Sequence, residues 1–218
     1  MIFLLMSDIH NRYDRMVRIV RKEVFDAVII AGDFTYGGSL DDVSRALRMI
    51  REHTDKPIYF VPGNCDPAEL LEFGLDDDGI YNLHGRVIRI GHLYLLGIGG
   101  SNITPFNTPI EFTEDEIRSI LNSIGGEYRP EKTILVSHVP PYNTVDILHS
   151  GVPVGSIALR EYIDRVKPLA VLCGHVHESS GYTQRGGTLI VNPGPVMYSR
   201  YAIINIDDTI IPELRLEY

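Results

Sequence analysis

Five short apolar runs, each followed closely by a polar side chain that can bind metal, constrain the fold of this chain more than any other feature. The run at residues 28–31 is typical, because it stops at Gly32 and is followed by Asp33. Short apolar runs bounded by such residues predict buried strands of an α/β sheet. Side chains just past the carboxyl ends of these strands gather in one crevice. We therefore expect the ends of the five runs to converge.

The side chains that follow the runs have the composition of a metal site. Carboxylate, amide and imidazole ligands suit borderline divalent ions such as Mn, Fe, Co, Ni or Zn better than calcium. Residues i and i+2 of an extended chain face the same way, so Asp8 with His10, and His175 with His177, can each present two ligands to one cavity. Asp33 stands alone and can bridge two ions. The runs and their following side chains are residues 3–6 with Asp8 and His10, 28–31 with Asp33, 58–61 with Asn64, 134–136 with His138, and 171–173 with His175 and His177.

Amphipathic segments between the runs predict helices. Capping residues mark two helix starts, Ser39 with Asp42 and Thr113 with Glu116. Asp66 is expected to be the N-cap of a further short helix. Strands alternating with helices indicate an α/β fold, and because no linker-like stretch divides the chain we expect one domain over residues 1–218. The predicted helices are residues 12–23, 39–53, 67–74, 113–124 and 156–166, and the further predicted strands are 87–90, 93–96, 188–191, 201–206 and 210–218.

Charge and cysteine content argue against several classes of function. The formal net charge is −9 and no run of lysine or arginine offers a phosphate-binding stripe, which argues against bulk nucleic acid as a partner but allows a small phosphorylated substrate. Cys65 and Cys173 form no spaced disulfide framework, which indicates a reducing compartment. No basic segment precedes the apolar residues 1–6, and no apolar run approaches the roughly 20 residues of a membrane helix. We therefore expect a cytoplasmic protein with no membrane contact, and the sequence leaves a homo-oligomer open.

Five motifs occur in a fixed order along the chain. They are Asp8-Ile9-His10, Gly32-Asp33, Gly63-Asn64-Cys65-Asp66, His138 and Gly174-His175-Val176-His177. In this order they resemble the calcineurin-like metallophosphoesterase family, whose pattern is Asp-x-His, Gly-Asp, Gly-Asn-His-Asp/Glu, a lone histidine after a strand, and Gly-His-x-His. The resemblance implies a four-layer α-β-β-α sandwich of two mixed β-sheets. The ligands that it implies are Asp8, His10, Asp33 and His177 for one metal ion, and Asp33, Asn64, His138 and His175 for the other.

The resemblance implies a dinuclear metal-dependent phosphoesterase, in which a metal-bridging hydroxide attacks phosphorus in line, and manganese is the ion expected to support activity in an assay. The charge balance of the site is consistent with this chemistry. Two divalent ions bring four positive charges, two carboxylates and a hydroxide remove three, and the remaining positive charge attracts a phosphate. We expect a phosphodiesterase that acts on small or nucleotide-like esters. The alternatives are a phosphomonoesterase, and a metal-binding scaffold of the same fold that binds protein partners. A nuclease would be expected to carry a basic surface and an added domain.

Two positions depart from the family pattern, and both bear on the substrate. Cys65 stands where the family has a histidine that is assigned to protonate the leaving group, and Pro62 stands where Ser/Thr protein phosphatases have an arginine. General acids contribute ~10²–10⁴-fold, so the first change argues against esters with poor leaving groups unless another group donates the proton. Cys65 could donate one, although a packing role is the simpler interpretation. The second change argues against a protein phosphatase.

The remaining candidates are residues that could act on or contact the substrate. Loops as long as residues 99–112 are often functional, and a basic side chain just past His10 could meet a phosphate. Turn and solvent-exposed roles explain these residues about equally well. The candidate catalytic residues are Asn64, Cys65 and His138, and the candidate substrate contacts are Arg12, Asn102 and Asn107.

Overall fold

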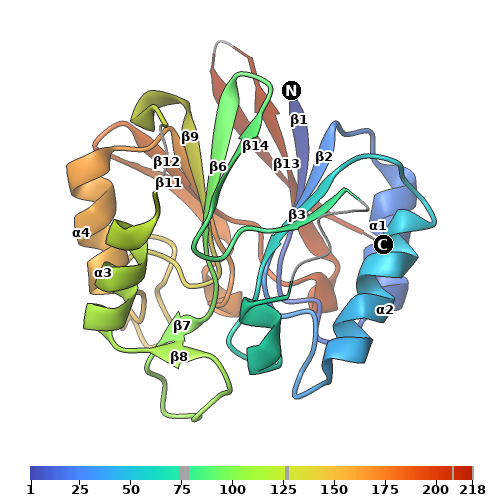
Figure 1. Cartoon of the computed structure of the whole chain (residues 1–218), viewed down its shortest axis with the longest axis horizontal. Coiled ribbons are helices and arrows are strands. Elements are labelled where there is room, and N and C mark those ends of the chain that lie inside the picture. Colours follow the sequence, from blue (N-terminus) through green and yellow to red (C-terminus); the bar gives the residue numbers. More distant parts are fainter. Residues whose placement is uncertain (74–78, 126–127, 208, 218) are drawn as a thin grey trace.

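The structure, a computed structural model, describes residues 1–73, 79–125, 128–207 and 209–217. In this part of the chain two six-stranded β-sheets pack face to face, and helices cover their outer faces (Figure 1). The predicted α/β fold, a four-layer α-β-β-α sandwich of two mixed sheets, is confirmed. The single domain over residues 1–218 stays a prediction.

The first sheet combines parallel and antiparallel strands. Its members are β1 (Ile2–Met6), β2 (Ala27–Ala31), β3 (Ile58–Val61), β4 (Ile80–Asn82), β13 (Arg200–Ile206) and β14 (Ile210–Leu216). The strand order is β14-β13-β1-β2-β3-β4, with β1 to β4 parallel and β13 antiparallel to both β1 and β14. The carboxyl ends of β1, β2 and β3 therefore lie at one end of the sandwich.

The second sheet also combines parallel and antiparallel strands. Its members are β5 (Val87–Ile90), β6 (Leu93–Ile98), β9 (Thr133–Ser137), β10 (Ala170–Leu172), β11 (Gly181–Arg185) and β12 (Thr188–Asn192). The order is β11-β12-β10-β9-β6-β5, in which β12, β10, β9 and β6 are parallel and the edge strands β11 and β5 are antiparallel. Two short strands, β7 (Ser101–Asn102) and β8 (Glu111–Phe112), pair apart from both sheets.

Four α-helices form the outer layers of the described chain. They are α1 (Tyr13–Lys22), α2 (Leu40–Arg51), α3 (Glu114–Ser123) and α4 (Ile157–Val166), with short 3₁₀ turns at η1 (Ala68–Leu71), η3 (Pro130–Lys132), η4 (His177–Ser179) and η5 (Val196–Tyr198). Helices α1 and α2 cover the first sheet and α3 and α4 the second (Figure 1). The predicted capping boxes at Ser39 and Thr113 are confirmed. In the described ranges, every helix is too short or too polar to cross a membrane.

Three apolar clusters hold the layers together. The central cluster lies between the sheets and includes Phe3, Ile29 and Val136, all fully buried. Two outer clusters attach the helix pairs to the sheets. Each large side chain buried in this way contributes about 1.5–3 kcal/mol. This packing holds the strands of both sheets in register, so the loops at their carboxyl ends are brought close together.

The structure corrects three local predictions. Strands β4 and β11 were not expected from the sequence, because β4 has only three residues and β11 is a partly exposed edge strand. The helix expected over residues 67–74 is a 3₁₀ turn, Ala68–Leu71, without a side-chain cap, because the Asp66 carboxylate bonds elsewhere. Residue 74, like residue 218 at the end of the last predicted strand, lies outside the described residues.

Candidate metal centre

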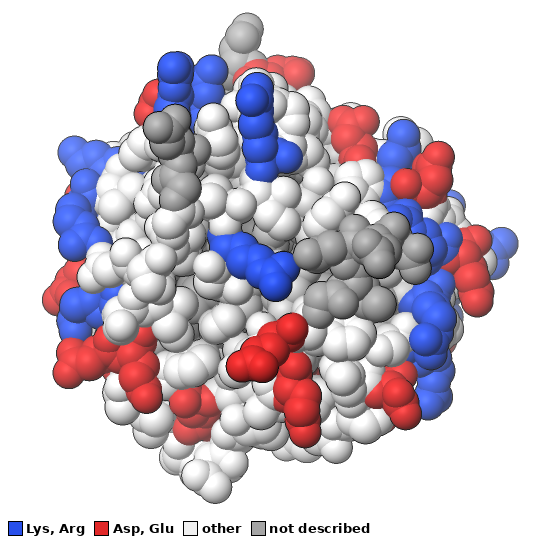
Figure 2. Space-filling view, in the orientation of Figure 1, with Lys and Arg blue, Asp and Glu red and all other residues white. Residues whose placement is uncertain are grey.

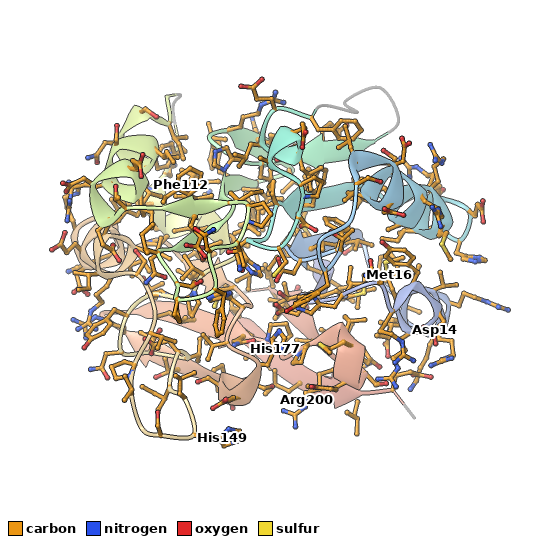
Figure 3. All side chains as sticks on the ribbon, turned by 90° about the horizontal axis from the view of Figure 1, so that it is seen from below. Asp14, Met16, Phe112, His149, His177 and Arg200 are labelled. Atoms are coloured by element: carbon orange, nitrogen blue, oxygen red, sulfur yellow. The ribbon has the colours of Figure 1, made fainter. Side chains whose placement is uncertain are left out.

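The side chains that follow all five apolar runs meet at one end of the sandwich. Figure 3 looks onto this end and places His177 near its middle. Strands β1, β2 and β3 of one sheet and β9 and β10 of the other end here. The resulting groups of possible ligand atoms, each within 4.8 Å of one another, are Asp8 with His10 and His177; His10 with Asp33 and Cys65; and Asp8 with Asp33 and His138.

Left-handed backbone turns aim these side chains, so the expected extended geometry is wrong. Asp8, His10, Asp33 and His175 have φ values of 54°, 45°, 56° and 67°. Strand β1 ends at Met6, so Asp8 and His10 lie on a turn and not on an extended chain. Residues in this conformation cost about 1–3 kcal/mol and persist only where their surroundings hold them. Backbone bonds do so here, since the amides of Asp8 and His10 donate to the carbonyl oxygens of Gly32 and Asp33 at 3.0 Å.

The first part of the site surrounds His10 and His177. Their Nε2 atoms lie 3.3 Å apart, and Nε2 of His177 lies 3.2 Å from Oδ1 of Asp8. Nε2 of His10 is 3.5 Å from Oδ2 of Asp33. Nδ1 of His10 faces the carbonyl oxygen of Thr35 at 3.3 Å, and since a carbonyl only accepts, this ring nitrogen carries the proton. The Nε2 lone pair of neutral His10 therefore points into the site.

The second part of the site surrounds His138, which is fully buried. Its Nδ1 donates to the carbonyl oxygen of Ala31 at 2.7 Å, so the lone pair of the neutral ring is on Nε2. Nε2 lies 2.9 Å from Oδ1 of Asn64 and 3.4 Å from Oδ2 of Asp33. In a neutral ring, this nitrogen and these two oxygens are all acceptors. They therefore require a cation between them, either a proton on Nε2 or a metal ion.

A chain of hydrogen bonds fixes which way the Asn64 amide points. The Thr108 hydroxyl donates to Oε1 of Glu111 at 2.6 Å, so it can only accept from Nδ2 of Asn64, 3.0 Å away. This leaves Oδ1 of Asn64 facing His138. Glu111 accepts further bonds from Thr104, and these bonds outweigh its partial burial and lower its pKa to about 2. The Glu111 carboxylate thus orders the loop that orients Asn64.

The carboxylates of Asp8 and Asp33 stay ionised although they are buried. Burial alone would raise the pKa of Asp8, but the imidazoles of His177, His138 and His10 outweigh it and hold this pKa far below its usual range. Burial acts the same way on the pKa of Asp33, and His138 outweighs it there. Oδ1 of Asp8 is buried, and Nε2 of His177 faces it at 3.2 Å. An ionised buried oxygen needs a donor or a cation, and a metal ion shared with His177 would supply one, so its position fits a metal ligand.

His175 lies outside the groups of close ligand atoms given above, yet its chemistry suits a ligand. Its backbone amide donates to Oδ2 of Asp8 at 3.0 Å, and its ring centroid lies 5.0 Å from that of His138. Burial, aided by the positive charge of His138, lowers the pKa of His175 to about 4. The ring is therefore neutral at physiological pH and keeps a lone pair for a cation.

Cys65 orients the site through its backbone. Its amide donates to Oδ1 of Asp33 at 2.8 Å, while its sulfur accepts from Nδ2 of Asn64 at 3.6 Å. Burial raises the pKa of the thiol well above its usual value, and the charges of Asp33 and Asp66 add to this effect. The thiol therefore stays protonated and is a weak acid.

Asp66 joins two ligand-bearing loops beneath the site, a role that the sequence did not suggest. One carboxylate oxygen accepts from the amide of Thr35 at 2.9 Å and the other from the amide of Gly63 at 2.9 Å. Burial and the charge of Asp33 raise the pKa of Asp66 to about 7. Its position directly after Asn64 and Cys65 was the only signal in the sequence, and it also fits an N-cap.

Two glycines allow the loops to approach the carboxylates closely. A Cβ at Gly63 would overlap the Asp33 carboxylate, and a Cβ at Gly174 would overlap Ser7 and press on Asp8. Neither neighbour is the free end of a flexible side chain. Glycine is therefore required at both positions for the ligands to meet.

The predicted substrate residues lie around the site without converging on it. Nε of Arg12 faces Asp14 at 3.3 Å, and Nδ2 of Asn102 donates to the carbonyl oxygen of Val154 at 3.3 Å, which joins two loops. Asn107 is exposed and has a φ of 52°. A substrate role for these three residues stays a prediction.

Two tyrosines that the sequence analysis did not select touch the site. The ring of Tyr36 lies 5.6 Å from that of His10, and the ring of Tyr198 lies 6.3 Å from that of His177. Tyr36 lies in a loop and Tyr198 ends the 3₁₀ turn η5, and neither segment has a periodic pattern, so no signal in the sequence distinguished them from other surface tyrosines.

Comparisons with known proteins agree with this geometry. A family model described as calcineurin-like phosphoesterase matches residues 1–179. An uncharacterized protein of Methanocaldococcus jannaschii is 36% identical over 200 residues, which cover 89% of this chain and 88% of that protein. A solved structure from Thermus thermophilus has 17% identity and a TM-score of 0.73, covering 99% of this chain and 98% of that one. A dimetal phosphatase of Danio rerio has 14% identity and a TM-score of 0.62, covering 99% and 96%. These two structures show a shared fold.

Proposed function

Since this chain belongs to the calcineurin-like phosphoesterase family, we propose that it is a metal-dependent phosphodiesterase that acts on small or nucleotide-like esters. The observation that carries the proposal is the meeting of acceptors at His138, where Nε2 lies 2.9 Å from Oδ1 of Asn64 and 3.4 Å from the Asp33 carboxylate. The buried Oδ1 of Asp8, which faces Nε2 of His177 at 3.2 Å, supports it independently. Both features fit a site for divalent cations.

The proposed ligands divide between two ions. Metal ions bound here would lower the pKa of water to supply a nucleophile at neutral pH, and would offset the negative charge of a phosphoryl group. Asp33 lies near the imidazoles of both His10 and His138 and is placed to serve both ions. The ligands that we assign are Asp8, His10, Asp33 and His177 for one ion, and Asp33, Asn64, His138 and His175 for the other.

The chain itself prepares this site in three ways. The carbonyl oxygens of Thr35 and Ala31 fix the tautomers of His10 and His138, so that each neutral ring turns Nε2 inward. Thr108 fixes the Asn64 amide. The backbone amide of Cys65 holds the Asp33 carboxylate, which makes Cys65 a positioning residue in this proposal. A preorganised set of this kind costs little reorganisation during reaction.

The absence of a strong acid at Cys65 means that diesters with good leaving groups should react fastest, and that a diester with a poor leaving group, such as a dinucleotide, should react slowly. The thiol of Cys65 is a weaker acid than an ordinary cysteine, so it donates a proton poorly. On the face in Figure 2, the described lysines and arginines are scattered among aspartates and glutamates, with no continuous basic stripe. The described cysteines, Cys65 and Cys173, are free, which supports a cytoplasmic location.

Hydrolysis of model esters tests the proposal. The protein is stripped of metal with EDTA, reloaded with Mn²⁺, Ni²⁺ or Zn²⁺, and assayed with bis(p-nitrophenyl) phosphate and p-nitrophenyl phosphate. We expect metal-dependent activity with a higher kcat/KM for the diester. Activity that survives chelation would contradict the metal site, and a preference for the monoester would contradict the diesterase. Inactivity with each metal, together with a rise in Tm on adding Mn²⁺, would favour a metal-binding scaffold.

A further inference from the structure

Four aromatic rings form a row across the mouth of the site. The ring centroids of Tyr36 and His10 lie 5.6 Å apart, those of His10 and His177 5.2 Å apart, and those of His177 and Tyr198 6.3 Å apart. The successive rings meet at 69°, 65° and 86°, so each contact is edge-on. Two proposed metal ligands therefore occupy the middle of the row, and a tyrosine occupies each end.

The backbone on either side of Tyr36 is anchored to the site. The amide and hydroxyl of Thr35 donate to the buried Asp66, and the amide of Gly37 donates to the carbonyl oxygen of Cys65 at 3.3 Å. The Tyr36 side chain is nonetheless 75% exposed. The backbone at Tyr36 is therefore held in place, while its ring is open to solvent.

The backbone before Tyr198 is anchored to a different loop of the same site. The amide of Val196 donates to the carbonyl oxygen of Ser7 at 2.9 Å, and the amide of Met197 donates to that of Asp8 at 3.1 Å. Arg15 donates a further bond to the Met197 carbonyl oxygen. The Tyr198 side chain is 58% exposed. Both tyrosines therefore have fixed positions relative to the metal ligands, although they come from different parts of the chain.

Held, exposed aromatic rings are suited to stack on planar groups of a ligand. A single exposed aromatic side chain is ordinary on a protein surface and indicates nothing. These two differ because each touches a proposed ligand histidine, and because each touches a different histidine of the pair. Aromatic side chains stack on nucleobases of any sequence, since every base has a planar face. The nearby Arg12 pairs with Asp14, with Nε 3.3 Å from Oδ1.

We propose that Tyr36 and Tyr198 are two stacking platforms, which bind the two planar arms of a phosphodiester such as a dinucleotide. This inference rests on the proposed function, because it takes the phosphate to lie beside His10 and His177. A diester phosphate there carries one organic arm toward each end of the row. A monoester has one arm and leaves one tyrosine unused. The two platforms therefore indicate that the substrates are diesters with an aromatic group on each side of the phosphate.

Substitution of the tyrosines tests the platforms. The dinucleotide ApA, with two bases, is compared with adenosine 5′-monophosphate methyl ester, with one, in the manganese-loaded enzyme. We expect Tyr36→Ala and Tyr198→Ala each to raise KM for ApA about ten-fold, the scale of losing one base–aromatic stack, with kcat nearly unchanged. The methyl ester should respond to one of the two changes only. Phenylalanine at either position keeps the ring and should restore most of the affinity.

Tyr182→Ala is the matched control. Tyr182 on β11 is 58% exposed, like Tyr198, but no ring contact joins it to a site histidine among the described residues. Equal KM values for ApA in wild type and both alanine variants would overturn the platforms. An equal rise in KM in the Tyr182 variant would overturn them as well. In either case, metal-dependent hydrolysis would still uphold the proposed function. Calorimetric titration of ApA into the metal-free protein gives a readout without turnover. Binding that weakens in both alanine variants without hydrolysis in the loaded enzyme would overturn the proposed function alone, and unchanged binding would overturn the platforms.

Discussion

The floor and the rim of the site differ in how the fold holds them. The floor consists of Asp8, Asp33, Asn64 and His138, which are at most 3% exposed and whose polar atoms are bonded to neighbouring loops or face one another. The rim consists of Tyr36 and Tyr198, whose side chains are 75% and 58% exposed. Packing and charge leave the floor almost no freedom, whereas the side chains of the rim are open to solvent. We infer that the floor performs the chemistry on every substrate and that the rim selects among substrates.

The largest expected effect is that of Asp33→Asn in the floor. The substitution keeps the size of the side chain but removes the charge that lies 3.5 Å from His10 and 3.4 Å from His138. We expect a loss of about 10²–10³-fold in kcat on every ester, the scale of removing one stabilising group from a preorganised site. Metal content, measured on the same samples, should fall as well.

Asp41→Asn is the matched control for this change, because Asp41 is an exposed carboxylate of α2. It should leave kcat and metal content near those of the wild type. A substrate-dependent loss in the Asp33 variant would contradict the distinction between floor and rim, since a floor residue should affect all esters alike.

The next effect concerns Cys65, which lies at the boundary of floor and rim. Cys65→His introduces a side chain that can protonate a leaving group, so we expect hydrolysis of esters with poor leaving groups to rise by about 10²-fold, the low end of general acid catalysis. Activated p-nitrophenyl esters should change far less. Rates on both ester types for Cys65→His and for the control Cys65→Ala separate the added acid from the lost thiol. An equal gain on both types would rule out the leaving-group argument.

A smaller effect is a pH dependence of stability in the metal-free protein. Burial alone would lower the pKa of His138, but the Asp33 carboxylate outweighs it and raises this pKa to about 9, above the unfolded value of ~6.5. The protonated ring therefore stabilises the fold fully below about pH 6.5, and this contribution disappears as the pH rises through about 9. We expect the free energy of unfolding, from urea titrations, to fall across this window.

His138→Gln isolates this contribution. Asp66, whose pKa burial and the charge of Asp33 raise to about 7, is present in both proteins, so the difference between the two curves reports on His138. Saturating Mn²⁺ should remove the dependence, because a metal ion then takes the place of the proton. Parallel curves of unfolding free energy against pH for wild type and variant would contradict the arrangement in which His138 faces Asn64 and Asp33 in the floor.

The smallest effect is expected for Phe106→Ala, which lies outside both the floor and the rim on the loop that carries Thr108. Its ring is 80% exposed, so the free energy of unfolding should change by no more than about 0.5 kcal/mol. Metal affinity and kcat on small esters should also stay within about two-fold of wild type, as expected for a surface position. Thermal unfolding and metal titration check both points. A large loss of metal affinity would show that this loop and the floor are coupled.

Much of the fold followed from local patterns in the sequence. Alternating apolar runs and amphipathic segments predicted the principal strands and the α-helices of the described chain, since each pattern arises from the period of a single element. Short or half-exposed elements such as β4 and β11 lack a strong pattern, so they were missed. Asp66 was misjudged for a related reason, because Asp before Pro is a common helix start, whereas its actual partners, Thr35 and Gly63, come from separate loops.

The sequence by itself determined which side chains of metal-binding type follow which strands, because parallel strands carry their carboxyl ends to a common edge whatever the details of packing. Only the tertiary structure decided how those side chains face one another. His10 and His177 are 167 positions apart, yet their Nε2 atoms lie 3.3 Å from each other. The orientation of Asn64 and the exposure of Tyr36 and Tyr198 likewise depend on contacts between distant loops. Such contacts have no periodic signature, because they arise from three-dimensional packing and not from the geometry of one strand or helix.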